Sequence, residues 1–160
     1  MNNKILGLFV VLSLVIFSSS TYAQDNASGI TKLSKGADLI FTGKVVKQNS
    51  TWNEDKTRIF TNVTITVDNY LKGYEGNTII ITHPGGEIGD VGELYTHVPT
   101  FTDKEEVLLF VKKDSQSKYY EVFQGESGKM TILEDKVTGE KKTVQNRKVT
   151  TLKNEIKNSL

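Results

Sequence analysis

The chain of 160 residues contains no cysteine, only two prolines and a single tryptophan. Without thiols it cannot form disulfides, hold a thiolate metal site or use a cysteine nucleophile. Beyond residue 17 it also lacks any apolar run near the 20 or so residues that a membrane-spanning helix needs. Core packing must therefore stabilise the fold, and thiol catalysis and thiol redox chemistry are excluded.

The N-terminus has the order of a secretory signal peptide. Lys4 supplies a positive charge, an apolar run of thirteen residues follows at 5–17, and a polar stretch ends in the small residue Ala23. The run is too short to span a bilayer. We expect residues 1–23 to be a signal peptide that is cleaved after Ala23, which leaves 24–160 as one secreted or periplasmic domain.

Charge is divided unevenly along this mature chain. Residues 136–160 carry seven Lys/Arg against two Asp/Glu, a net charge of +5, and residues 24–135 carry twelve against seventeen, a net charge of −5. The basic end could bind an acidic partner, or it could dock on the acidic remainder of its own chain. The acidic majority opposes nucleic-acid binding, because phosphate contacts need clustered Lys and Arg.

Short strands dominate the hydrophobic pattern. The clearest covers 58–73, where apolar and polar residues alternate, so one face is buried and the other is solvated. The polar turn 53–57 predicts that 38–50 and 58–71 pair as a long hairpin. Further strands are expected at 77–83, 105–113, 118–123, 129–135 and 137–144. The segments 118–123 and 129–135 are expected to pair with each other as a second hairpin.

Two helices frame the strands. Ser28 is a candidate N-cap for a short helix over 28–38. The apolar stripe of a C-terminal helix consists of Val149, Leu152, Ile156 and Leu160. We expect that helix to cover one end of the barrel. Six to eight short strands with glycine turns predict a mainly β fold, a small OB-like closed β-barrel with a short N-terminal helix and a C-terminal amphipathic helix.

The segment 81–101 holds both histidines, both prolines and four of the thirteen glycines. Proline lacks a ladder donor and glycine permits positive φ, so Pro84, Gly85 and Gly86 should end the third strand. The following loop, 84–99, is expected to be anchored on the barrel by Leu94, Tyr95 and Val98. Such a loop either contacts a partner or is only structural. The candidate partner-binding residues are Trp52 at the hairpin tip and Pro84, Gly85, Gly86, Glu87 and Tyr95 in the loop.

Two other functions stay open at this point. His83, Glu87 and His97 could supply nitrogen and oxygen ligands to a metal, as in a metal-binding protein or metal-dependent enzyme, although their spacing matches no compact motif. Carbohydrate could stack on exposed aromatic residues. The candidates for that role are Trp52, Phe60, Tyr70, Tyr119 and Tyr120. The glycine-flanked Ser127 lies between strands, which does not favour a serine nucleophile. We expect no catalysis and no cofactor.

The layout of motifs resembles a known family. ADLIFTGKVV at 37–46, TNVTITVDNYLKG at 61–73, a glycine-rich loop and FTDKEEVLLFVKK at 101–113 follow one another. This order is similar to the OB-fold barrel of the tissue inhibitors of metalloproteinases and netrin-like modules, and to exported bacterial proteins of the same layout. The resemblance covers about residues 30–133 and implies a barrel that acts by interaction.

One departure limits what the resemblance implies. The metalloproteinase inhibitors chelate the protease zinc through an N-terminal cysteine, whereas here the expected mature N-terminus is Gln24. That inhibitory mechanism is therefore not expected. The sequence predicts an exported, non-catalytic binding module for an exported or extracellular protein, inhibitor-like in the general sense, that uses the loop 84–99.

Overall fold

The structure, a computed structural model, describes residues 21–115 and 119–160. Most of the expected signal peptide, residues 1–20, lies outside the described residues. In chain order the elements are α1 (Thr21–Gly36), β1 (Leu39–Trp52), β2 (Ile59–Lys72), β3 (Thr78–Pro84), β4 (Gly86–Ile88), β5 (Val91–Glu93), β6 (Glu106–Lys113), β7 (Tyr120–Val122), the 3-10 helix η1 (Gly125–Gly128), β8 (Lys129–Glu134), β9 (Lys141–Thr143) and α2 (Val149–Ser159).

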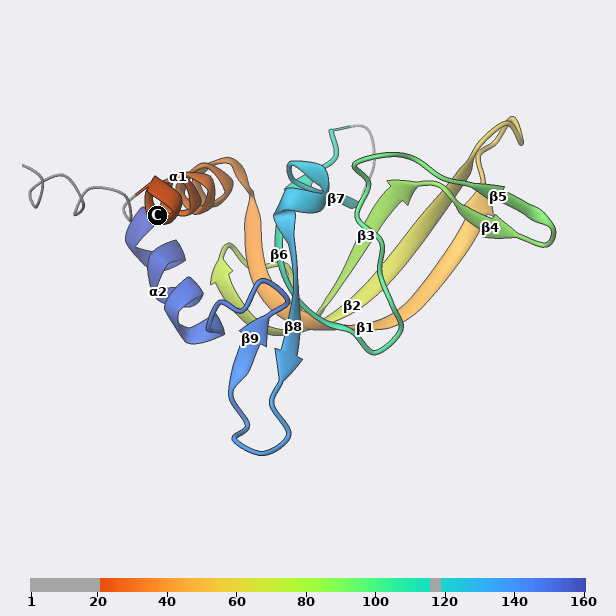
Figure 1. Cartoon of the computed structure of the whole chain (residues 1–160). Helices are drawn as coiled ribbons and strands as arrows, with labels where there is room; N and C mark the ends of the chain where they lie inside the picture. Colours follow the sequence, from red (N-terminus) through yellow and green to blue (C-terminus); the bar gives the residue numbers. More distant parts are fainter. Residues whose placement is uncertain (1–20, 116–118) are drawn as a thin grey trace, which may run out of the picture.

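Five strands close a barrel in the order β1-β2-β3-β7-β6, and β6 returns to pair with β1 (Figure 1). Neighbouring strands are antiparallel except for β3 and β7, which run parallel. β8 and β9 extend the sheet beyond β6, and β4 pairs with β5 in a separate small sheet. The predicted small OB-like barrel is therefore confirmed, with seven strands in its main sheet.

β1 and β2 form the long hairpin that the alternating pattern predicted. Their register shifts at three points, so both strands bend around the barrel. Gly43 lies at one of these shifts, and a Cβ there would lie 2.5 Å from the Thr66 carbonyl oxygen. The missing side chain lets the two backbones approach at the bend, as the curvature of a small barrel requires.

Alternating faces of the strands build two cores. The barrel interior is filled mainly by Leu39, Phe41, Val45, Val63, Ile65, Ile79, Ile81, Phe101, Val107, Leu109 and Val111. The outer face of β1, β6 and β8 packs against both helices through Ile30, Leu33, Ile40, Leu108, Phe110, Ile132, Val149, Leu152 and Ile156. Because β6 contributes to both cores, Val107–Val111 are all buried, and the central position predicted for this strand is confirmed.

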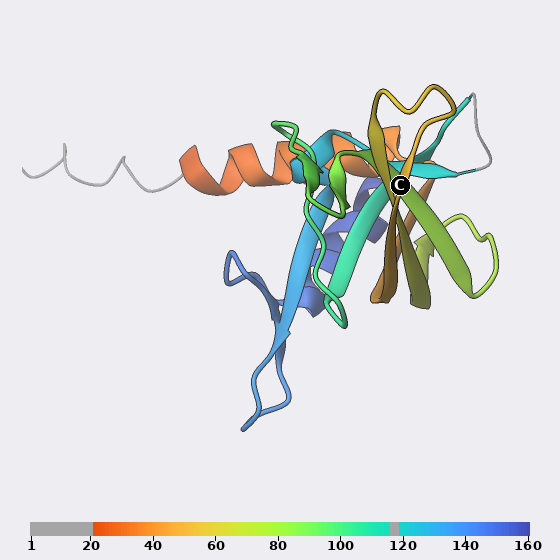
Figure 2. The ribbon, with the colours of Figure 1, turned by 90° about the vertical axis from the view of Figure 1, so that its right-hand side faces the viewer.

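Residues 136–160 dock on the remainder of the chain. α2 packs against α1 in the outer core and covers a face of the sheet, so the expectation that it covers one end of the barrel was wrong. The β8–β9 hairpin projects from the barrel in both ribbon views (Figure 1, Figure 2). Lys141 Nζ lies 2.6 Å from Glu106 Oε2, so the basic segment neutralises carboxylates of its own chain.

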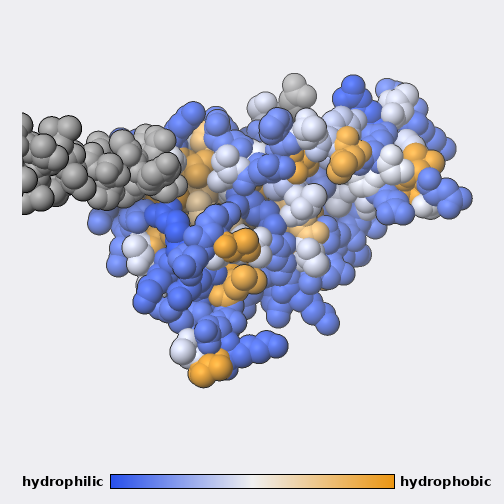
Figure 3. Space-filling model, in the orientation of Figure 1, coloured by the Kyte–Doolittle hydropathy of each residue, from blue (hydrophilic) through white to orange (hydrophobic). Residues whose placement is uncertain are grey.

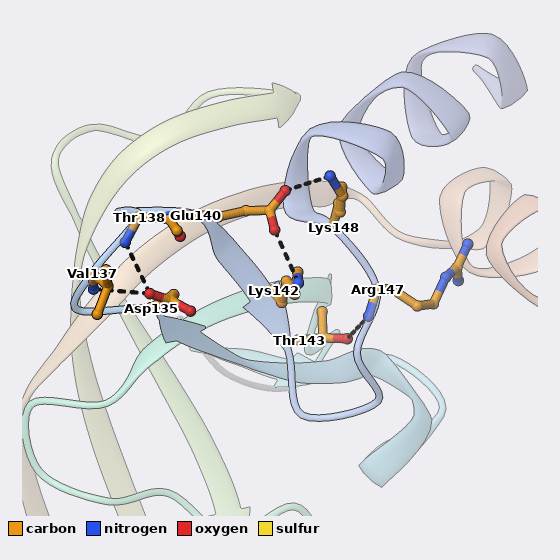
Figure 4. A network of polar contacts seen from close by, with 8 residues as sticks. All are labelled: Asp135, Val137, Thr138, Glu140, Lys142, Thr143, Arg147 and Lys148. Atoms are coloured by element: carbon orange, nitrogen blue, oxygen red, sulfur yellow. Dashed lines mark hydrogen bonds and ion pairs between the residues drawn. The ribbon is translucent and has the colours of Figure 1, made fainter.

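Charged side chains also join β9 to the start of α2 (Figure 4). The Glu140 carboxylate forms two ion pairs. One of its oxygens lies 2.9 Å from Lys142 Nζ, and the other lies 2.5 Å from Lys148 Nζ. Asp135 accepts hydrogen bonds from the amides of Val137 and Thr138 and so closes the turn between β8 and β9. These contacts stabilise the connection between the protruding hairpin and the helix.

The predicted hairpin of 118–123 with 129–135 was wrong. Within the described residues, β7 and β8 do not pair with each other, and η1 lies between them. Both pair with one edge of β6, β8 along Glu106–Leu109 and β7 along Val111–Lys113. β6 is long enough to hold both short strands end to end, and this arrangement lets β7 also reach β3 and close the barrel.

Two boundaries of the helices differ from expectation. α1 begins at Thr21, so Ser28 lies inside the helix instead of capping it. Leu160, expected on the apolar stripe of α2, follows the last helical residue and is 56% exposed. Helix ends lack part of their intrahelical hydrogen bonds, so the residue that follows the last turn is not held over the core.

Candidate functional site

A cavity of about 750 Å³ opens where the tip of the β1–β2 hairpin meets the connection from β3 to β6. Figure 2 views the molecule from this side, with β4 and β5 in front. The polar lining consists of Gln48, Asn49, Ser50, Thr61, His83, Glu87, Glu93 and Thr100. The apolar lining includes Pro84, Ile88, Leu94, Tyr95, Val98, Pro99 and Phe101. This size and mixture of surfaces are typical of binding pockets.

Hydroxyl groups and glycines form one wall of the cavity. Thr61 faces inward on β2, and its Oγ1 donates a 2.7 Å hydrogen bond to the Gly85 carbonyl. The Ser50 hydroxyl lies 2.9 Å from Thr61 Oγ1. Gly86 has a φ of 139°, and a Cβ there would collide with the same Thr61 oxygen. Only glycine lets the loop pass this close to β2.

Glu93 ties the small β4–β5 hairpin to the barrel. Its Oε2 accepts hydrogen bonds from the Ile59 amide and from the Tyr95 hydroxyl, both at 3.1 Å. The Gly85 amide donates to the Ile59 carbonyl at 2.8 Å, so both backbone groups of Ile59 hold the loop. The hydrogen bond to Glu93 raises the pKa of Tyr95.

His83 lies at the inner side of the cavity against an aromatic ring. Its imidazole stacks on Phe101 with ring centroids 6.0 Å apart, and its Nδ1 lies 3.0 Å from the Pro84 carbonyl oxygen. Burial lowers the pKa of His83, although the contact with the carbonyl opposes this shift. The imidazole is therefore neutral at pH 7.

Lys129 contacts the aromatic ring of Phe101 without lining the cavity. Its Nζ lies 5.0 Å from the ring centroid and 2.6 Å from Glu105 Oε1. Burial alone would raise the pKa of Glu105, but hydrogen bonds from Lys129, Thr131 and the Thr102 amide lower it below the usual value. The positive charge of Lys129 is thus paired with the Glu105 carboxylate, outside the cavity.

The structure brings most of the predicted partner-binding residues together. Pro84, Gly85, Gly86, Glu87 and Tyr95 all line the cavity. Trp52 ends β1 and is 36% exposed at the same end of the molecule, outside the lining.

The anchoring of the loop 84–99 differs in part from expectation. Tyr95 and Val98 are half-buried, as an anchoring role requires, whereas Leu94 is 92% exposed and anchors nothing. Pro99 and Phe101 are buried in its place. The exposed leucine follows β5 directly.

Sequence reasoning missed the β4–β5 hairpin and the inward-facing Thr61. A Gly-Asp pair between Ile88 and Val91 is a hairpin signal, and Gly89 indeed has a φ of 60°. Each strand has only three residues, which is too short for a periodicity to be recognised. Thr61 occupies a position of the buried face of β2, so a polar residue in an apolar stripe was the available signal.

The alternative metal site does not assemble. Among the described residues, no group of three or more His, Asp or Glu side chains is placed to hold a metal ion, and this includes His83, Glu87 and His97. His97 is exposed with a φ of 64°, and its carbonyl accepts from the Glu126 amide. His83 is instead held against Phe101.

The aromatic candidates for carbohydrate stacking are mostly engaged in packing. Tyr120 is buried in the barrel, and Tyr70 packs against Phe41 and donates a 2.7 Å hydrogen bond to the Gly76 carbonyl. Phe60 and Tyr119 are half-buried. Of the five candidates only Trp52 is exposed, so these five residues form no row of stacking rings.

No protein-family model and no curated protein sequence matches the chain. Within residues 21–115 and 119–160, neither helix has the length and apolar character to cross a bilayer. The cavity is open to solvent and bordered by exposed apolar side chains, which is an arrangement suited to capturing part of another molecule.

Proposed function

We propose that the protein is an exported, non-catalytic module that binds another protein through the loop 84–99 and the cavity beneath it. The observation that carries the proposal is the cavity of about 750 Å³ with exposed apolar side chains at its border. Val91, Leu94 and Trp52 are exposed at this end, and the space-filling view has hydrophobic patches over the β4–β5 region (Figure 3). Of these three, tryptophan is the residue type enriched among the anchors of protein interfaces.

The hydrogen bonds around the cavity support binding in preference to catalysis. The hydroxyls of Ser50 and Thr61 bond to each other and to the Gly85 carbonyl, and the imidazole of His83 contacts the Pro84 carbonyl. A serine or threonine nucleophile requires its hydroxyl to be paired with a base. These groups instead hold the loop rigid, which reduces the entropy lost when a partner binds.

Export rests on the N-terminal pattern of residues 1–23. Its test is the intact mass of the protein recovered from the exported fraction of its host. We expect a chain that begins at Gln24, and recovery of the uncleaved chain in the cytoplasm would contradict export. Cleavage there would retain most of α1, including the buried Ile30 and Leu33.

Site-specific photo-crosslinking tests the binding surface. A photoreactive phenylalanine analogue at position 94 should yield a covalent adduct with a partner protein in the host's exported fraction. The matched control is the same analogue at Val137, which is 94% exposed on the β8–β9 hairpin. Equal adducts from both positions, or none from position 94, would contradict the proposed surface.

A further inference from the structure

The charged residues that line the cavity are all of one sign. Of its described lining residues, Glu87 and Glu93 carry a full charge, both negative, and none is lysine or arginine. His83, whose side chain ordinarily titrates near neutrality, is held neutral here because burial lowers its pKa. A concave space with two carboxylates focuses negative potential, because nearby protein lowers the local dielectric.

One of these carboxylates is fixed in place. Both hydrogen bonds of Glu93, from the Ile59 amide and the Tyr95 hydroxyl, end on Oε2. A carboxylate has about four acceptor positions, so Oε1 retains acceptor capacity for a ligand. Glu87 is exposed on β4 and is free to adjust its position at the border.

The remaining lining is mixed. Ile88, Leu94, Tyr95, Val98 and Phe101 present carbon surface, and Gln48, Asn49, Ser50, Thr61 and Thr100 add uncharged polar groups. A ligand that contacts the carboxylates and this carbon surface together combines an apolar stem with a positively charged head. Among protein side chains, only lysine and arginine have that composition, and arginine can also bond a carboxylate with two parallel N–H groups.

We infer that the cavity binds a lysine or arginine side chain presented by the protein partner. This rests on the proposed function and specifies the chemistry that the partner must carry. The charge complementarity between two carboxylates and one basic head selects this occupant over an acidic or purely apolar one. Arginine is also among the residues that contribute most binding energy at protein interfaces.

Arg58 provides an internal comparison. It is exposed just before β2 and is close enough to Tyr95 for its charge to lower the pKa of that phenol, against the larger effect of Glu93. Its guanidinium therefore opposes part of the negative potential at the cavity. Removing this charge should strengthen the binding of a basic side chain, whereas removing a carboxylate should weaken it.

The test is an NMR titration of the folded mature protein with N-acetyl-arginine amide, N-acetyl-lysine amide and N-acetyl-citrulline amide, the last being the neutral analogue of arginine. The two basic compounds should shift the amide resonances of Gly85, Gly86 and Gly92 saturably, with a dissociation constant on the order of 1 mM. Citrulline should bind at least about tenfold more weakly.

Charge variants make the assignment specific. Glu87→Gln should weaken arginine binding about threefold, and Glu87→Gln with Glu93→Gln about tenfold or more, since glutamine keeps an oxygen acceptor without the charge. Arg58→Gln should strengthen binding. Glu121→Gln, an exposed carboxylate on β7 outside the cavity lining, is the matched control and should change nothing.

Equal binding of arginine and citrulline, unchanged binding in the double variant, or the absence of saturable shifts would each overturn the inference. These outcomes are separable from failure of the proposed function. A position-94 adduct that persists in the double variant would leave protein binding intact while rejecting a basic anchor.

Discussion

At the scale of single residues, Lys72 determines how α1 ends. The last carbonyls of a helix have no intrahelical partner and carry the negative end of its dipole. Lys72 Nζ donates hydrogen bonds to the carbonyls of Ser34, Lys35 and Ala37 at 2.8, 3.3 and 2.6 Å. One ammonium group from β2 therefore satisfies the end of the helix and fixes it to the barrel.

Replacing Lys72 with methionine should lower the free energy of unfolding by about 1–3 kcal/mol, because it removes charge-assisted hydrogen bonds and keeps the apolar stem. Urea unfolding measures the change. Lys47→Met, at an exposed position of β1, is the control and should have an effect within about 0.5 kcal/mol. Equal effects of the two substitutions would rule out this role of Lys72.

Gly86 combines two constraints at one position. Its φ of 139° is one that residues with a side chain rarely adopt, and a Cβ would collide with the Thr61 and Ser50 hydroxyls. Gly86→Ala should therefore destabilise the protein by about 2–4 kcal/mol and distort the cavity.

Gly89→Ala separates the two constraints on Gly86. Gly89 also has a positive φ, of 60°, but nothing lies within 4 Å of the position that a Cβ would occupy there. Its substitution should cost about 1–2 kcal/mol, since only the left-handed conformation opposes it. Calorimetric melting of both variants provides the measurement, and a smaller loss for Gly86→Ala would show that the hydroxyl wall yields easily.

At the scale of elements, α2 and α1 form a layer on the outer face of the barrel. The two helices cover β1, β6 and β8, and they share one apolar core with those strands (Figure 1). Through this layer, the basic segment 136–160 is attached to the acidic remainder of the chain. Its attachment depends on a few apolar side chains at helical spacing.

Leu152→Ala should lower the free energy of unfolding by about 2–5 kcal/mol, because Leu152 is fully buried and its truncation leaves a cavity. Leu160→Ala should change it by less than about 0.5 kcal/mol, since that side chain is exposed. Both residues belong to the same predicted stripe, so the pair tests the docking of α2 directly. A large loss in the Leu160 variant would contradict the observed end of the helix.

At the scale of the whole molecule, two half-buried titratable groups make stability depend on pH. The pKa of His83 is lowered by burial, and that of Glu105 is lowered because its hydrogen bonds outweigh burial. The folded state therefore binds fewer protons than the unfolded chain in acid. Each group contributes stability at pH values above its pKa in the unfolded chain, which is 6.5 for His83 and 4.5 for Glu105. This contribution is lost as the pH falls through the lower pKa of the same group in the folded protein.

His83→Gln should reduce the loss of stability on acidification from neutral pH to about pH 5, because glutamine does not titrate in that window. Urea unfolding at the two pH values measures the difference. The unmodified protein, measured under the same conditions, is the reference and should lose more stability than the variant. If the two lose equal stability, burial of His83 is not the cause of the pH dependence.

The sequence by itself determined which faces are buried and where the chain turns. The alternation in β1 and β2 predicted their inward residues, and the continuous apolar run of β6 predicted its burial on both faces. The loop residues Pro84, Gly85 and Gly86 were also predicted to be partner-binding candidates, and all three line the cavity. These features depend on neighbouring residues only, because side-chain direction alternates along a strand regardless of its partner.

Only the tertiary structure decided how the strands beyond the first hairpin pair and what the cavity contains. β7 and β8 share one edge of β6 because closing the barrel requires β7 to reach β3, a condition that no local pattern contains. The cavity brings together Thr61, Glu93 and Phe101 from distant parts of the chain. Which charged residues line it, and therefore the single sign of their charge, depends on this arrangement. Contacts between residues far apart in sequence depend on the closure of the whole barrel.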